Sequence, residues 1–390
     1  MIIFNNNNAI LTTHKMKERI LLSLAHMGGT EKNWVDEAFR TNWIVPLGPN
    51  VDEFEHRLEK YLNHGKLVAL SAGTAALHLG LVLLGVEKDD EVICQSFTFS
   101  ASANPICYQG AKPVFVDSEP ETWNMCPIAL EQAIIDRKKV TGKYPKAIIP
   151  VHLYGMPAKM DEINAIAQKY NIHILEDAAE ALGSRYKGQM CGTLGNYGAL
   201  SFNGNKIITT SGGGALICPN EETAQRVKFY ATQARENRPY YYHEVIGYNY
   251  RMSNVCAGIG CGQMDVLAEH VARRQEIHDI YKSGLSNIEG LTILDNPNSD
   301  YQSNFWLTTI LISPKMGKTP DEIRIALDKE NIETRLLWRP MHMQPIYHDA
   351  PYYGSNVAET LFNQGLCLPS GSSLTDEDIH RVIDAIKAQF

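Results

Sequence analysis

Short apolar runs alternate with longer amphipathic stretches through the first half of the chain. Mostly aliphatic runs predict buried strands at residues 67–70, 91–94, 113–117, 146–151, 172–175, 199–202 and 214–218. Apolar positions at helical spacing predict helices at 32–39, 51–62, 101–108 and 161–170. Strands that alternate with helices predict an α/β fold with a mainly parallel central sheet and right-handed crossovers.

The last third of the chain has a different pattern. A long polar helix is predicted at 264–281, and a strand-like run at 305–312 is followed by helices at 321–330 and 376–390. This pattern is typical of a smaller α+β domain. We therefore expect a large α/β domain with its N-terminal segment over residues 16–262, and a linking helix with a small C-terminal domain over residues 263–390. Residues 1–15, which contain an Asn run, are expected to be disordered.

Three glycines, Gly258, Gly260 and Gly262, resemble part of a dinucleotide-binding loop. They lack the final spacing of that motif and follow no predicted strand. We expect them to allow close helix packing instead.

Composition and charge narrow the functional classes. The 390 residues are 44% hydrophobic and 21% charged, which is ordinary for a globular enzyme. With a net charge of -8 and no basic tract, the chain shows no electrostatic footprint for nucleic acid. No apolar run approaches the roughly 20 residues that a membrane helix needs, so we expect no membrane partner. The eight cysteines have no C-x-x-C spacing, which favours free thiols in the cytoplasm and no metal site.

An acidic residue and a lysine follow two of the predicted strands. The run at 172–175 places Asp177 at the carboxyl end of a strand, where ligands sit in open α/β sheets. The run at 199–202 leads into a turn that carries Lys206. A lysine nucleophile and a carboxylate are what pyridoxal phosphate (PLP) requires, for its aldehyde carbon and its ring nitrogen respectively. Taken alone, the pair also fits a surface lysine and a capping aspartate.

The junction at 71–78 joins a strand to an Ala/Leu-rich helix through small residues. The free backbone N–H groups of such a helix start can bind a phosphate. A helix cap that serves stability alone is the other interpretation.

Several motifs together resemble one family. In chain order they are SAGTAALHL, QSFTFSASAN, VHLYG, EDAAEALGS, SFNGNKIITTSGGG, GYNYRMSN, ETRLLWRPMHMQP and LCLPSG. They resemble the PLP-dependent sugar aminotransferases of the DegT/DnrJ/StrS family, over roughly residues 20–388. The resemblance implies a fold type I PLP enzyme, similar to aspartate aminotransferase, and a homodimer with shared active sites.

The resemblance also implies roles for single residues. Lys206 matches the Schiff-base lysine, and Asp177 matches the carboxylate on the pyridine nitrogen. Relatives with histidine at the lysine position are dehydratases, so Lys206 favours transamination. Other cofactor contacts are implied for Gly73 and Thr74 at the phosphate, Phe99 stacked on the ring, Ser201 at the phosphate, and Asn249 reaching the phosphate from the other subunit.

Glu180 stands where many relatives have glutamine, near the phenolic oxygen of the cofactor. An ionised glutamate would be repelled by a phenolate. Our hypothesis is that Glu180 is protonated or turned toward the substrate.

The substrate pocket is predicted from side-chain chemistry and from resemblance. Arg335 offers a fork for a diphosphate, and Trp338 a flat face for a base or sugar, although an ion pair and core packing are equally good interpretations. His342 can contact sugar or cofactor, although a lone histidine more often has a structural role. His26 lies where the N-terminal segment of the family closes over the substrate. The sequence around the lysine resembles enzymes that aminate C4 of a UDP-linked 4-keto-6-deoxy-N-acetylglucosamine in bacillosamine-type pathways, with L-glutamate as the implied donor. The alternatives are a GDP-linked sugar, as in perosamine synthesis, and a non-catalytic regulator.

Overall fold

The computed structural model describes residues 18–390, so the disorder predicted for residues 1–15 lies outside the described residues. Its centre is an eight-stranded sheet in the order β1-β9-β8-β5-β4-β2-β3-β14. Neighbouring strands pair in parallel except at β9, which is antiparallel to β1 and β8. The predicted mainly parallel sheet is therefore confirmed. Its strands are β1 (Lys66–Leu70), β2 (Glu91–Gln95), β3 (Lys112–Val116), β4 (Ala147–Ile149), β5 (His173–Asp177), β8 (Tyr197–Ser201), β9 (Gly214–Cys218) and β14 (Tyr352–Tyr353).

Both faces of this sheet are buried, which explains its nearly continuous apolar strands. Along β1, Leu67 and Ala69 join one hydrophobic cluster, whereas Val68 and Leu70 join the other. This alternation follows from the two-residue period of a strand. The first cluster includes residues of the helices α2 (Pro49–Leu62), α5 (Pro127–Thr141) and α6 (Met160–Tyr170), and the second those of α3 (Gly73–Leu83), α4 (Asn104–Tyr108) and α7 (Glu221–Ala231).

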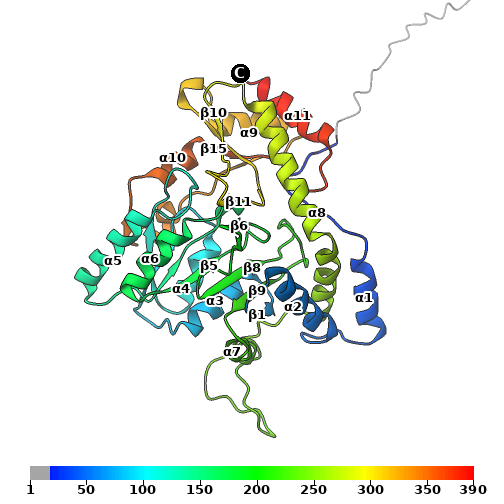
Figure 1. Ribbon diagram of the computed structural model, residues 1–390, viewed down its shortest axis with the longest axis vertical. Helices are drawn as coiled ribbons and strands as arrows, with labels where there is room; N and C mark the ends of the chain where they lie inside the picture. Colours follow the sequence, from blue (N-terminus) through cyan, green and yellow to red (C-terminus); the bar gives the residue numbers. More distant parts are fainter. Residues whose placement is uncertain (1–17) are drawn as a thin grey trace, which may run out of the picture.

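The long helix α8 (Asn254–Leu285) runs from the large sheet to a smaller antiparallel one (Figure 1). That second sheet has the order β10-β12-β15-β13. The predicted division at residues 262 and 263 falls inside α8, and β14 from the later part joins the large sheet. The small-domain elements are β10 (Leu291–Ile293), β12 (Thr309–Ile312), β13 (Arg335–Leu336), β15 (Gly365–Cys367), α9 (Pro320–Lys329), α10 (Val357–Gln364) and α11 (Asp376–Lys387).

The glycines of α8 lie where other helices approach. An added Cβ would lie 2.6 Å from the Asn50 side chain at Gly258, 2.7 Å from Phe54 at Gly260, and 2.6 Å from the Glu31 backbone at Gly262. These contacts belong to α2 and to α1 (Glu31–Arg40). The predicted helix packing is confirmed.

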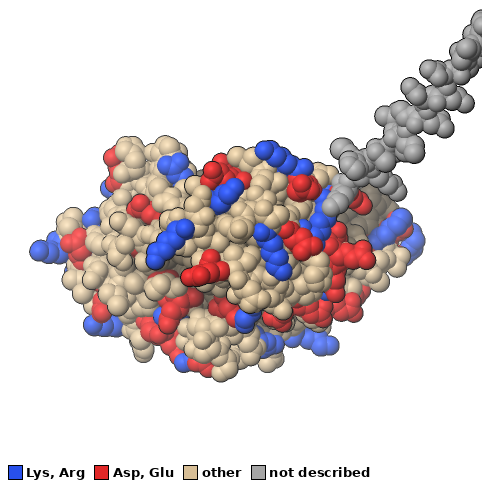
Figure 2. All heavy atoms as spheres, turned by 90° about the horizontal axis from the view of Figure 1, so that it is seen from above, with Lys and Arg blue, Asp and Glu red and all other residues tan. Residues whose placement is uncertain are grey.

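The surface shows mixed charge. On the face in Figure 2, Lys and Arg side chains are scattered among Asp and Glu side chains. Within residues 18–390, no helix has the length and apolar character needed to cross a membrane.

Candidate active site

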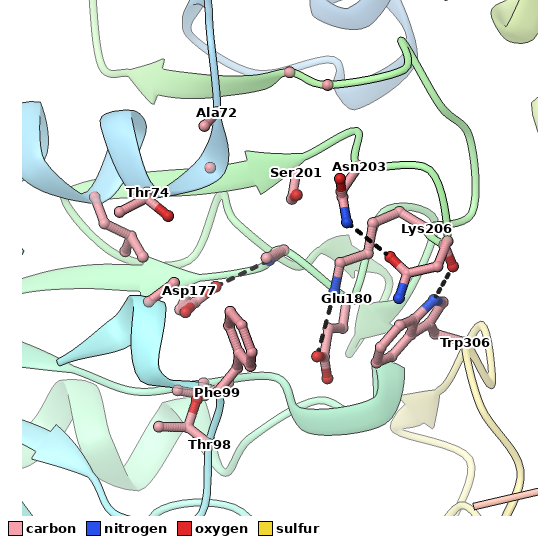
Figure 3. A pocket seen from close by; sticks show the side chains of 18 of the residues that line it. Ala72, Thr74, Thr98, Phe99, Asp177, Glu180, Ser201, Asn203, Lys206 and Trp306 are labelled. Atoms are coloured by element: carbon pink, nitrogen blue, oxygen red, sulfur yellow. Dashed lines mark hydrogen bonds and ion pairs between the residues drawn. The ribbon is translucent and has the colours of Figure 1, made fainter. Parts of the chain in front are cut away.

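A cavity of about 270 Å³ opens at the carboxyl edge of the large sheet (Figure 3). This is the edge at which open α/β folds bind ligands. Segments that follow β1, β2 and β8 meet there with the end of β5. Eight of the predicted site residues line the cavity: Gly73, Thr74, Phe99, Asp177, Glu180, Ser201, Lys206 and Trp338.

One end of the cavity is a cradle formed by the first turn of α3. Ala72 precedes this helix in an extended conformation and provides no side-chain cap, which leaves the first N–H groups without a side-chain acceptor there. A Cβ on Gly73 would come within 3.0 Å of the Ser201 Cβ and 3.2 Å of the Leu200 carbonyl oxygen. A close backbone turn, a helix N-terminus and a hydroxyl from Ser201 suit a phosphate group.

Asp177 points into the cavity from the end of β5. Its Oδ2 accepts a 2.6 Å hydrogen bond from the buried Ser102 hydroxyl, and its Oδ1 accepts one from the Ala179 amide at 3.1 Å. These bonds hold the carboxylate in a fixed orientation, as a partner for a protonated ring nitrogen must be. Ser102 was not singled out in the sequence, although it lies in the QSFTFSASAN motif.

Glu176, the neighbour of Asp177, points away because successive strand residues face opposite sides. Its fully buried carboxylate accepts backbone N–H groups of Gly192 at 2.8 Å and Leu194 at 2.6 Å. His152 lies 2.8 Å from the same carboxylate through Nε2, and its Nδ1 accepts the Ala158 amide. Of the two adjacent acids, one therefore secures a loop and the other faces the cavity.

Lys206 ends between an acidic and an aromatic group (Figure 3). Its Nζ lies 3.3 Å from Oε1 of Glu180 and 3.8 Å from the centre of the Trp306 ring. The amine is therefore held between a carboxylate and the face of an aromatic ring. Sequence reasoning missed Trp306, whose only signal was an aromatic side chain in a segment predicted to be a strand.

Glu180 is a buried residue whose carboxylate contacts the Lys206 amine. Its Oε2 accepts the Tyr154 amide at 2.7 Å, so both carboxylate oxygens have donors. Burial raises the pKa of Glu180, and nearby Asp177 adds to this, while the Lys206 amine and the Tyr154 amide oppose it. In this arrangement Glu180 is turned toward the lysine.

Phe99 and Trp338 form an aromatic edge of the cavity. Phe99 is 54% exposed, and its ring lies 5.6 Å from that of Trp338 at an angle of 53°. The Trp338 indole Nε1 is buried and has no hydrogen-bond partner among the described residues. An exposed ring and a free donor leave this edge able to receive a ligand.

Four predicted residues lie outside the cavity lining. Arg335 is largely exposed and pairs with Glu333 at 2.8 Å, beside a second cavity that shares Asn205, Trp306 and Trp338 with the first. His342 is hydrogen-bonded to Ser96 at 2.6 Å and to Glu359 at 3.2 Å. His26 is hydrogen-bonded to Ser372 and stacked on His270. Asn249 is exposed and follows the loop that comes after α7. Among residues 18–390, no group of His, Cys, Asp or Glu is arranged to hold a metal ion.

Comparisons with known proteins place this site in a family. The profile of the DegT/DnrJ/EryC1/StrS aminotransferase family matches residues 26–387. EpsN of Bacillus subtilis, described as a PLP-dependent aminotransferase, is 48% identical over 96% of this chain and 97% of its own. GDP-perosamine synthase of Escherichia coli O157:H7 is 38% identical over 92% of this chain and 95% of its own.

Solved structures agree with the sequence comparisons. Spr1654 of Streptococcus pneumoniae, described as a sugar aminotransferase and solved in a PLP form, has a TM-score of 0.86 and 28% identity. The superposition covers 95% of this chain and 98% of the other. These neighbours confirm the fold type I architecture and the PLP cofactor expected from the sequence. The chain belongs to the DegT/DnrJ/EryC1/StrS aminotransferase family and is a PLP-dependent sugar aminotransferase.

Proposed function

We propose that this enzyme transfers an amino group from L-glutamate to C4 of a UDP-linked 4-keto-6-deoxy-N-acetylglucosamine. One observation carries the transamination chemistry: Lys206, Asp177 and the Gly73–Thr74 turn face a single cavity. When bound, PLP supplies an electron sink for the carbanion formed at the donor carbon. The cytoplasmic location is part of this proposal and is supported by the eight free cysteines.

Each residue contributes a defined interaction. Lys206 would hold PLP through its aldehyde carbon, and its amine would move a proton to or from the reacting carbon. The Asp177 carboxylate, fixed by Ser102, holds the proton of the ring nitrogen. Phosphate binding falls to Gly73, Thr74 and Ser201, and Phe99 covers the ring.

Glu180 is proposed to act next to the lysine rather than as a simple acceptor for the cofactor. Its raised pKa allows it to share a proton with the Lys206 amine across 3.3 Å. Glu180→Gln keeps the shape but removes the acid. We expect the pH profile of kcat to lose one ionisation, and an unchanged profile would contradict this role.

We propose a homodimer in which Asn249 completes the phosphate site of the partner subunit. Asn249 is exposed and does not line the cavity of its own chain. The loop before it extends from the body in Figure 1 and exposes Tyr241, at 81%, and Ile246, at 80%. Exposed apolar side chains of this kind mark protein contacts. Asn249→Ala should weaken PLP binding without changing the oligomeric state in solution.

The sugar nucleotide is proposed to extend into the second cavity, past Trp338 toward Arg335. The UDP-linked sugar is favoured by the resemblance of the stretches around the lysine and at 333–342. A GDP-linked 4-keto-6-deoxymannose is the second candidate, because GDP-perosamine synthases are 38% and 36% identical to this chain.

The deciding experiment is product analysis. The enzyme, PLP and L-glutamate are incubated with each keto-sugar nucleotide separately, and the product is examined by mass spectrometry and NMR. We expect an amine at C4 of the UDP-linked sugar. Amination of only the GDP-linked sugar would move the assignment to the second candidate, and amination of neither would overturn both.

A further inference from the structure

Arg274 is a fully buried cation in the middle of α8, 1% exposed. None of the ion pairs among residues 18–390 includes it. Instead Nη1 donates to the carbonyl oxygens of Trp306 at 2.5 Å and Ser370 at 2.9 Å, and Nη2 donates to the Ser23 hydroxyl at 3.0 Å. Burial lowers the pKa of Arg274 to about 9, which leaves the guanidinium charged at neutral pH. A buried charge without a carboxylate is costly, so its position calls for a physical explanation.

The bonds of Arg274 belong to a closed ring of four residues. Ser23, which accepts from Arg274, donates its own hydroxyl proton to the carbonyl oxygen of Asn205 at 2.8 Å. The Trp306 indole Nε1 donates to the same oxygen at 2.7 Å. Two donors saturate the lone pairs of that carbonyl. The ring closes through the Trp306 carbonyl, which accepts from Arg274.

This ring fixes both supports of the catalytic amine. Asn205 directly precedes Lys206, so its carbonyl sets the backbone from which the lysine side chain leaves. The Trp306 ring is the surface on which the Lys206 Nζ rests, 3.8 Å from its centre (Figure 3). A shift of either support would move the amine relative to Asp177 and Glu180.

We propose that Arg274 is a positioning residue that acts through Ser23, Asn205 and Trp306 to hold the Lys206 amine at its point of attack on PLP. This inference rests on the proposed role of Lys206. A purely structural arginine would stabilise the fold and would affect cofactor binding with or without that lysine. A positioning arginine affects only the step that the lysine performs.

The test compares Arg274→Met in two backgrounds. With Lys206 present, the rate of covalent capture of PLP by the cofactor-free protein is followed by borohydride trapping and peptide mapping. Because misplacing a reacting group by about 1 Å costs up to about 100-fold, we expect capture at Lys206 to slow about tenfold or more. In a Lys206→Ala background, non-covalent PLP affinity is measured by tryptophan fluorescence. There Arg274→Met should change affinity by less than about twofold, since none of the four hydrogen-bonded residues is among those proposed to bind the phosphate or the ring nitrogen, which are Gly73, Thr74, Ser201 and Asp177.

The matched control is Arg273→Met, one position away, where the side chain pairs with Asp376 at 2.7 Å and does not join the ring. It should leave both measurements unchanged, and Arg274→Lys should restore part of the capture rate. Equal loss of affinity in both backgrounds, or an unchanged capture rate, would overturn the proposal. If Arg274→Met does not fold, Ser23→Ala breaks the same ring of hydrogen bonds. An unchanged capture rate in Ser23→Ala would also contradict the proposal.

Failure of the underlying function gives a different result. If Lys206→Ala still forms a reducible bond to PLP within the cavity, the assignment of the lysine is wrong. In that case Arg274→Met would not slow covalent capture at Lys206 in particular, and peptide mapping would identify the residue that does bond to PLP.

Discussion

The inner and outer ends of the active-site cavity are built in different ways. The inner end consists of Gly73, Thr74, Asp177, Ser201 and Lys206, which sit on or directly beside strands of one rigid sheet. The outer end is assembled from Trp338 and Arg335, which lie on and just after β13 of the small domain. The comparison indicates that the chemistry is held by a fixed frame, while the substrate side can vary without disturbing it.

The largest effect is expected at the inner end, from Lys206→Ala. Without an amine there is neither a covalent bond to PLP nor a proton carrier, so kcat should fall by at least about 10³-fold. Visible absorbance of the purified protein and turnover of the keto-sugar measure this. Lys187→Ala, at an exposed lysine paired with Asp161, is the control. Retained turnover in Lys206→Ala would break the assignment of this end.

The two adjacent acids separate chemistry from stability. Asp177→Asn should lower kcat about 10²–10³-fold, because a neutral amide does not stabilise the charge of a protonated ring nitrogen. Glu176→Gln should mainly lower the melting temperature, since its carboxylate bonds the Gly192 and Leu194 amides. Equal losses of kcat in both variants would show that the strand as a whole, rather than one carboxylate, is responsible.

Acid should weaken the helix that carries the phosphate turn. His78 of α3 accepts the Gln109 amide on Nε2 at 2.6 Å and faces the Tyr250 hydroxyl with Nδ1, and burial lowers its pKa to about 4. The unfolded chain therefore takes up the proton first as pH falls. The free energy of unfolding should drop between about pH 6.5 and 4 by at most about 3 kcal/mol. In His78→Gln, the free energy of unfolding measured by urea titration should depend less on pH over this range. The same pH dependence in the variant and the original protein would exclude His78 as the cause.

A smaller effect is expected from Gly73→Ala. The added methyl group meets Ser201 and the Leu200 carbonyl in the phosphate cradle, so PLP affinity should fall about tenfold. Gly204→Ala is the matched control, because nothing lies within 4 Å of its added Cβ. Equilibrium dialysis against PLP measures both. Equal affinities would show that the phosphate binds elsewhere.

The smallest effect is expected at the outer end. Arg335→Ala should raise KM for the sugar nucleotide about fivefold with little change in kcat, because it removes binding that is the same in ground and transition states. His342→Gln should leave KM nearly unchanged and lower stability instead, since His342 bonds Ser96 and Glu359. A large fall in kcat for Arg335→Ala would contradict the assignment of chemistry to the inner end and of substrate binding to the outer end.

The sequence by itself determined the α/β order, the strands predicted at 172–175 and 199–202, and a helix start within the junction at 71–78. The structure has these as β5, which ends at Asp177, β8, which ends at Ser201, and α3, which begins at Gly73. These are local patterns, because apolar spacing and small residues at a junction act over a few positions. Several boundaries were wrong. The helix predicted at 264–281 spans Asn254–Leu285, and the strand predicted at 146–151 spans Ala147–Ile149. The strand predicted at 305–312 begins at Thr309, and Phe305 adopts φ 46°, a left-handed conformation that strands do not contain.

Only the tertiary structure decided how distant segments meet. Ser102 reaches Asp177 across 75 residues, and Arg274 reaches Ser23 across 251 residues. The structure also placed His342 among structural partners and set Trp306 beneath the lysine amine. The physical reason is that the residue type and its local pattern are given by the sequence, whereas the partner of a side chain is decided by the packing of the whole chain. The role of Lys206 could be predicted from the sequence, but the ring of hydrogen bonds that supports it could not.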